Sequence, residues 1–85
     1  MSDEELEEQL GSLLLAQTKF TSAGYEVIYD KAGHVIITRA GHLRGIWLCE
    51  RGELQWIPAG YNAPTIRVSS TEAAVDATLD FLKIA

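Results

Sequence analysis

The sequence predicts an α+β fold in which two helices flank an antiparallel sheet of four to five strands. Capping-box patterns occur near both ends of the chain, and apolar residues follow each of them at helical spacing. Between them, apolar and polar residues alternate with a period of two, interrupted by turns at roughly ten-residue spacing. A chain of 85 residues has room for one core, so we expect a single domain over residues 1–85.

The N-terminal helix is expected from about Asp3 to Thr21. Ser2 and Glu5 have the spacing of a capping box, and leucines follow at intervals of three and four residues. Gly11 is a weak position inside this helix, costing about 1 kcal/mol relative to alanine. Gly24 is placed to end the segment in a left-handed conformation.

Four strands are expected between residues 25 and 57, and Thr65–Val68 can add a fifth at the edge of the sheet. Turn-forming residues separate the first four strands at Asp30–Gly33, Ala40–Gly41 and Arg51–Gly52. Because each separation is short, consecutive strands should pair as hairpins and form a meander. Ser69 and Glu72 then indicate a second capping box, which opens an amphipathic helix packed on the sheet and running to the C-terminus.

The stretch between the last strands, residues 58–64, is irregular because it contains two prolines. Tyr61 is its one large aromatic residue. This side chain can serve as an exposed anchor for a partner protein, since aromatic residues are enriched at interfaces. It can equally fold back over Trp56 as a lid on the core.

The net charge of −5 is unevenly distributed. The first 20 residues hold five acidic side chains and one lysine, whereas residues 25–68 hold five basic and four acidic ones. The helices therefore carry the acid and the sheet is near neutral, which argues against binding phosphates as the main activity. An acidic N-terminal helix is suited to docking on a basic partner, as in an inhibitor, accessory or chaperone-like protein.

The longest apolar run, Leu13–Ala16, is far shorter than the roughly 18 to 20 residues that cross a bilayer. The acidic N-terminus lacks the pattern of a secretory or mitochondrial signal. Cys49 is the single cysteine, which excludes an intramolecular disulfide, and we interpret it as a small buried hydrophobe. We expect no membrane span and a cytoplasmic location.

No residue pattern indicates catalysis, a metal or another cofactor. His34 and His42 stand at predicted turns without companions at metal-ligand spacing, and we expect both to be solvated. No serine or cysteine lies in a nucleophile elbow, and the glycines form no phosphate-binding loop. The sequence therefore predicts a protein that is not an enzyme.

The predicted sheet carries more apolar surface than one face can bury. One face should carry the aromatic and aliphatic residues Tyr25, Val27, Tyr29, Val35, Ile37, Leu43, Trp47, Leu54 and Trp56. The opposite face should carry Ile28, Ile36, Ile46, Leu48 and Ile57 among the polar residues Glu26, Thr38, Arg44 and Gln55. Five large aliphatic residues are more than a solvent-facing side usually shows.

Two arrangements would cover this second face. Each helix can cover a different face, or both helices share one face and the other meets a second copy or another protein. We interpret the chain as a small acidic, non-catalytic protein-interaction module, expected to be homodimeric. The candidate contact residues are Ile28, Ile36, Ile46, Leu48, Tyr61 and Arg44.

The alternative function is nucleic-acid binding by the arginines and aromatic residues of the sheet. Arg39, Arg44 and Arg51 surround Trp47 and Trp56, and such sheets can stack bases while holding phosphates. However, the two tryptophans are expected to face each other across a hairpin inside the core. That pairing would contribute on the order of 0.5 to 1 kcal/mol to the sheet.

Overall fold

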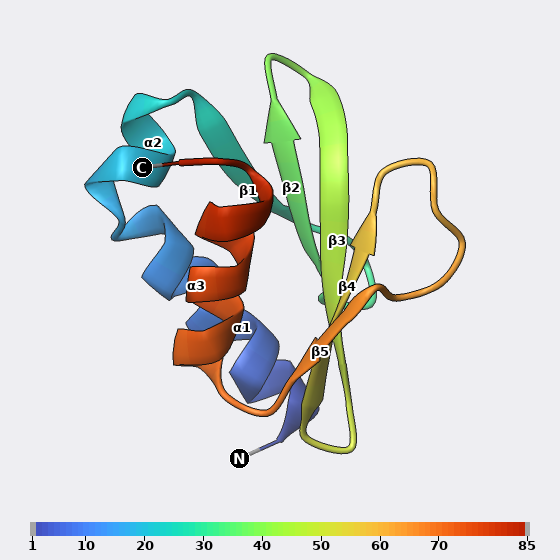
Figure 1. Ribbon diagram of the computed structural model, residues 1–85. Helices are drawn as coiled ribbons and strands as arrows, with labels where there is room; N and C mark the ends of the chain where they lie inside the picture. Colours follow the sequence, from blue (N-terminus) through green and yellow to red (C-terminus); the bar gives the residue numbers. More distant parts are fainter. Residues whose placement is uncertain (1, 85) are drawn as a thin grey trace.

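The computed structural model describes residues 2–84 and confirms the predicted α+β fold (Figure 1). The elements in chain order are α1 (Asp3–Leu15), α2 (Thr18–Ser22), β1 (Tyr25–Tyr29), β2 (Val35–Arg39), β3 (His42–Glu50), β4 (Glu53–Pro58), β5 (Ile66–Val68) and α3 (Thr71–Phe81). The five strands form one antiparallel sheet in the order of the sequence. The short fifth strand is present at the edge beside β4.

Helices α1 and α3 lie on the same side of the sheet (Figure 1). The core contains apolar side chains from all three helices. The buried sheet residues that join them all point to the same face of the sheet: Tyr25, Val35, Ile37, Trp47, Cys49, Leu54 and Trp56. We call this side the covered face. The arrangement with one helix on each face is therefore wrong, and the arrangement with both helices on one face is the one observed.

Two tryptophans form the centre of the core. Trp47 and Trp56 are directly opposite each other on β3 and β4, their ring centroids are 5.4 Å apart, and both are 0% exposed. The indole N–H of Trp47 donates to Thr78 Oγ1 of α3 at 2.8 Å, which satisfies a polar group that burial would otherwise penalise. The predicted cross-strand pair is confirmed.

The predicted helix from Asp3 to Thr21 is interrupted. Its capping box is present, because the Glu5 N–H donates to Ser2 Oγ at 3.2 Å and the Glu5 carboxylate accepts from the Ser2 N–H. The helix nevertheless ends at Leu15, and Gln17 adopts an extended conformation before α2 begins. This break turns Phe20 into the core, where its ring stacks on Tyr25 at 5.5 Å.

The C-terminal helix starts one residue later than its sequence pattern predicts. Its N-cap is Ser70, whose Oγ accepts from the Ala73 N–H at 3.1 Å, and not Ser69. The helix ends at Phe81, so it does not run to the C-terminus. The cap moves because Ser70 has the extended backbone that an N-cap needs.

A β-bulge shifts the pairing of β2 with β3. Ile37 pairs with Gly45 but Thr38 pairs with Leu43, so Arg44 has no partner in the ladder. Leu43 therefore shares a face with Thr38 and not with Trp47, and its placement on the covered face by simple alternation is wrong. Its side chain is 45% exposed.

Candidate functional site

Four isoleucines form a row across the face of the sheet away from the helices. The strand registers place Ile28 beside Ile36, Ile36 beside Ile46, and Ile46 beside Ile57, on β1 to β4 in turn. We call these four residues the isoleucine row. Adjacent β-branched side chains on one face pack against each other and stabilise the sheet, so the row forms a continuous apolar band.

This band belongs to a larger surface that no described helix covers. The open face, as we define it from the strand registers, consists of the isoleucine row together with Glu26, Thr38, Leu43, Leu48, Glu50, Glu53, Gln55 and Arg67. None of the isoleucine row belongs to the core cluster or to the partly buried residues packed on it. Ile28 is 51% exposed, and the other three are partly exposed. The predicted two-sided sheet thus has one side that no described helix covers, although Thr38 on that side is buried.

The candidate contact residues divide into two groups. Ile28, Ile36, Ile46 and Leu48 are brought together on the open face, as their alternation predicts. Tyr61 lies outside the sheet, in the connection between β4 and β5. Because it is 64% exposed, the interpretation of this residue as a lid over the core is wrong.

Arg44 is exposed at the bulge, at the end of the open face beside the β2–β3 turn. Leu43 is a member of the face that sequence reasoning missed. A bulge depends on the partner strand, so no local signal in the sequence reveals this change of side.

The ionic residues of the open face are concentrated at its two ends. Glu50 is directly opposite Glu53 beside the β3–β4 turn, and like charges in that position destabilise a sheet. Arg67 approaches Glu53 with Nε 3.8 Å from Oε1, and both side chains are largely exposed, so this pair contributes little. A surface hollow lined by Glu50, Arg51, Glu53 and Gln55 lies at the same end.

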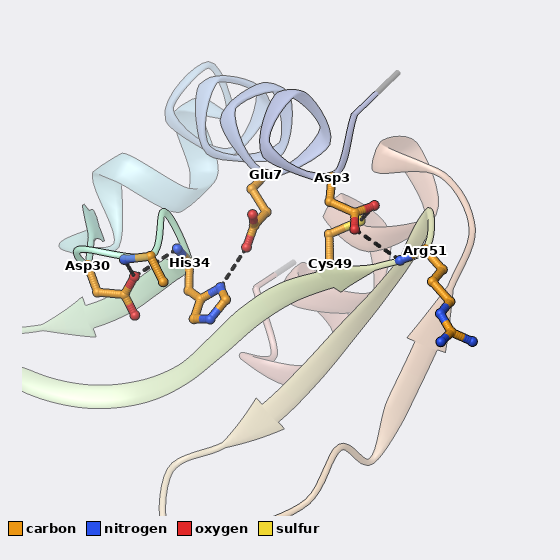
Figure 2. A network of polar contacts seen from close by, with 7 residues as sticks. Asp3, Glu7, Asp30, His34, Cys49 and Arg51 are labelled. Carbon is orange, nitrogen blue, oxygen red and sulfur yellow. Dashed lines mark hydrogen bonds and ion pairs between the residues drawn. The ribbon is translucent and has the colours of Figure 1, made fainter.

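On the covered side, Asp3 of α1 binds the turn between β3 and β4 (Figure 2). Its two carboxylate oxygens accept from the N–H groups of Gly52, at 2.8 Å, and Arg51, at 3.0 Å. The Gly52 hydrogen bond, followed by those from Arg51 and Cys49, lowers the pKa of Asp3 below its ordinary value. This carboxylate therefore fastens the start of the helix to a hairpin.

Glu7 lies one helical turn further along α1 and points toward His34 (Figure 2). It is buried, and its Oε2 lies 2.7 Å from Nδ1 of His34, just after the β1–β2 turn. His34 is partly buried, so its interpretation as a freely solvated turn residue is wrong. Because Asp3, Glu5 and Glu7 have internal partners, docking of α1 on a basic protein would rely on Glu4 and Glu8.

Cys49 is buried beside Asp3, as its interpretation as a small hydrophobe predicts. Its Sγ donates to Asp3 Oδ1 at 3.4 Å. Burial, followed by the hydrogen bond and the negative charge of Asp3, raises the pKa of the thiol to about 11. A thiol with this pKa is poorly suited to act as a nucleophile at neutral pH.

The tryptophans are not available to nucleic acid, because neither indole is exposed and base stacking needs an open aromatic face. Within residues 2–84, no group of three or more histidine, cysteine, aspartate or glutamate side chains is placed to hold a metal ion. None of the helices described is long and apolar enough to cross a membrane. Comparisons with protein-family models, with curated proteins and with solved structures found no match.

Proposed function

We propose that this chain is a non-catalytic protein-interaction module that forms a homodimer through the open face. The observation that carries the proposal is the isoleucine row, a contiguous apolar band that neither helix covers. Such bands are uncommon on isolated chains and mark places where proteins meet. A two-fold dimer is the commonest way to bury an identical patch on two copies.

The size of the open face supports the proposal. Five strands about 4.8 Å apart, each rising about 3.4 Å per residue, give a face of roughly 20 Å by 20 to 30 Å. A standard interface buries about 800 Å² of accessible surface on each partner. The corrugated open face and its rim are of that order, which amounts to about a sixth of the 5072 Å² that the chain exposes.

The composition of the face also supports a partner that is itself a sheet. Its centre contains aliphatic side chains without a buried charge, and the charged residues lie toward its ends. An apolar centre with a polar rim is the usual anatomy of an interface. Two sheets that pack face to face bury their inner side chains in a layer about 10 Å thick.

The mass in solution tests the proposal. We expect light scattering at micromolar concentration to give about twice the 9.4 kDa of one chain. Ile28→Glu and Ile46→Glu should give folded monomers, because a charge on the band would be buried without a partner in the dimer.

Leu15→Glu is the matched control, since Leu15 on α1 is 48% exposed and Ile28 is 51% exposed. This variant should stay dimeric. The proposal is wrong if the unmodified chain is strictly monomeric, or if the variants with a charge on the band dimerise as well as the control.

A further inference from the structure

The central strand of the sheet carries a pattern that is complementary to itself. From the bulge to the β3–β4 turn, alternate residues of β3 are a cation, two aliphatic residues and an anion: Arg44, Ile46, Leu48 and Glu50. Read in the opposite direction, the order becomes anion, aliphatic, aliphatic, cation. A second copy turned end for end would therefore present acid to base and leucine to isoleucine.

The two charged ends of this pattern are not engaged in ion pairs with other described residues. Among residues 2–84 the ion pairs are those of Glu7 with His34 and of Glu53 with Arg67, so neither Arg44 nor Glu50 belongs to one. The bulge leaves Arg44 outside the ladder, so cross-strand pairing does not hold it against a neighbour.

Glu50 instead faces the like charge of Glu53 beside the surface hollow at its end of the sheet, where the nearby cations are Arg51, which lines the hollow, and Arg67, whose contact with Glu53 is long and exposed. A cation arriving there would relieve this repulsion. The acidic end of β3 thus has a place for a basic side chain, and the other end of β3 carries one.

We propose that the occupant of the open face is a second copy whose β3 lies antiparallel over β3 of the first, with Arg44 of each chain reaching Glu50 of the other. This inference rests on the proposed function and adds the orientation of the dimer. The two-fold axis lies between the sheets, across β3 and between Ile46 and Leu48.

The reverse orientation, with the two β3 strands running the same way, is disfavoured by charge. It would place Arg44 of one chain near Arg44 of the other and the Glu50–Glu53 pair near a second such pair, and juxtaposed like charges across an interface are strongly unfavourable. Face-to-face sheets also keep their strands within about 30° of each other, so only strands near the axis stay in register. The charges of β3, the central strand, therefore select the orientation.

Charge reversal tests this orientation. We expect Arg44→Glu alone and Glu50→Arg alone each to weaken the homodimer, raising its dissociation constant about tenfold or more, because two symmetric contacts become repulsive. An equimolar mixture of the two variants should form a heterodimer about as tight as the unmodified dimer. In that mixture one chain carries acids at both positions and the other carries arginines, so both contacts are attractive again.

Lys31→Glu, at the exposed β1–β2 turn, changes the net charge as Arg44→Glu does and should leave the dimer intact. Native mass spectrometry distinguishes heterodimers from homodimers by mass. If the single variants dimerise like the unmodified chain while Ile46→Glu does not, the orientation is wrong and the interaction module stands. If the unmodified chain is monomeric, the proposed function fails, and this inference fails with it.

Discussion

The two faces of this sheet are built from different kinds of side chain, although they belong to the same strands. The covered face combines large and small residues: the Trp56 ring lies directly against Gly45 and edge-on to Phe81 of α3. The open face instead repeats one residue type across four strands. Side chains of unequal size fill the uneven space beneath helices, whereas an even row gives a flat surface that suits another sheet.

The polar contacts of the two faces also differ. On the covered side two acids of α1 have partners on the sheet. Asp3 accepts hydrogen bonds from two backbone N–H groups, and Glu7 lies 2.7 Å from His34 Nδ1. On the open side neither Arg44 nor Glu50 forms an ion pair with another of residues 2–84, and the Glu53–Arg67 pair is long and exposed. The covered side thus holds its acidic side chains with internal hydrogen bonds, although the buried indole N–H of Trp56 has no partner, whereas the charges at the ends of β3 form no ion pair among residues 2–84.

The largest effect is expected from Trp47→Ala on the covered face. Removing a fully buried tryptophan should lower the free energy of unfolding by about 3 to 5 kcal/mol. Ile28→Ala on the open face should cost about 1 kcal/mol or less in the monomer, because half of this side chain is already exposed. Urea titrations of both variants at concentrations where the chain is monomeric give the comparison. Similar losses would mean that the two faces are buried alike.

A smaller effect is expected from Gly45→Ala. An ideal Cβ at this position would lie 2.3 Å from Trp56 Cζ2 and 3.0 Å from the Ile57 carbonyl oxygen. Overpacking of this kind costs about 1 to 3 kcal/mol. Repeating the substitution in a Trp56→Phe background should reduce the loss, and the double-mutant cycle isolates the contact. Additive effects would show that the indole ring is not what excludes the methyl group.

Asp3→Asn should change the dependence of stability on pH. Because the pKa of Asp3 is lowered in the folded state, its contribution is fully present above the ordinary value of 3.8 and is lost as pH falls through the folded pKa. Urea midpoints between about pH 5 and pH 2 should therefore fall less steeply for the variant. Glu4→Gln, an exposed acid in the same turn, is the control for the change of net charge. Equal slopes for all three proteins would contradict the role of Asp3.

The last prediction concerns the reactivity of the Cys49 thiol in the unmodified chain. With its pKa raised to about 11, the Cys49 thiol should react with a thiol reagent near pH 8 on the order of 100-fold more slowly in the folded chain than in denaturant. Absorbance of the released chromophore measures both rates. Comparable rates would mean that Cys49 is accessible and ionised in the fold.

Local patterns in the sequence were sufficient to predict much of this structure. The Ser2–Glu5 capping box, the two-residue turns and the Trp47–Trp56 pair follow from spacing alone, because each depends on neighbours within one hairpin or helical turn. Even Ala40 and Arg51 adopt the positive φ that such turns require, 52° in both cases, each followed by a glycine.

Other features depend on contacts between distant segments and could not be predicted. His34 is partly buried because Glu7, 27 residues earlier, lies against it. Gly11 weakens α1, yet the absence of a side chain leaves room for the Tyr29 hydroxyl, which packs against this point of the helix. The placement of both helices on one face was left open by the sequence, since each apolar stripe could have covered either side.

The bulge at Arg44 gives the chain an uneven tolerance to change. Substituting this residue should leave the hydrogen-bonded ladder as it is. Position 44 has no partner in β2, and its one backbone contact, the carbonyl oxygen that accepts from the Ala59 N–H at 3.0 Å, does not involve the side chain. Deleting it would keep Leu43 opposite Thr38 on the open face, but it would remove the local bend and extra twist that a bulge gives a strand. The fold of the monomer should therefore accept many residue types at this site, whereas a homodimer of the proposed orientation requires a cation here.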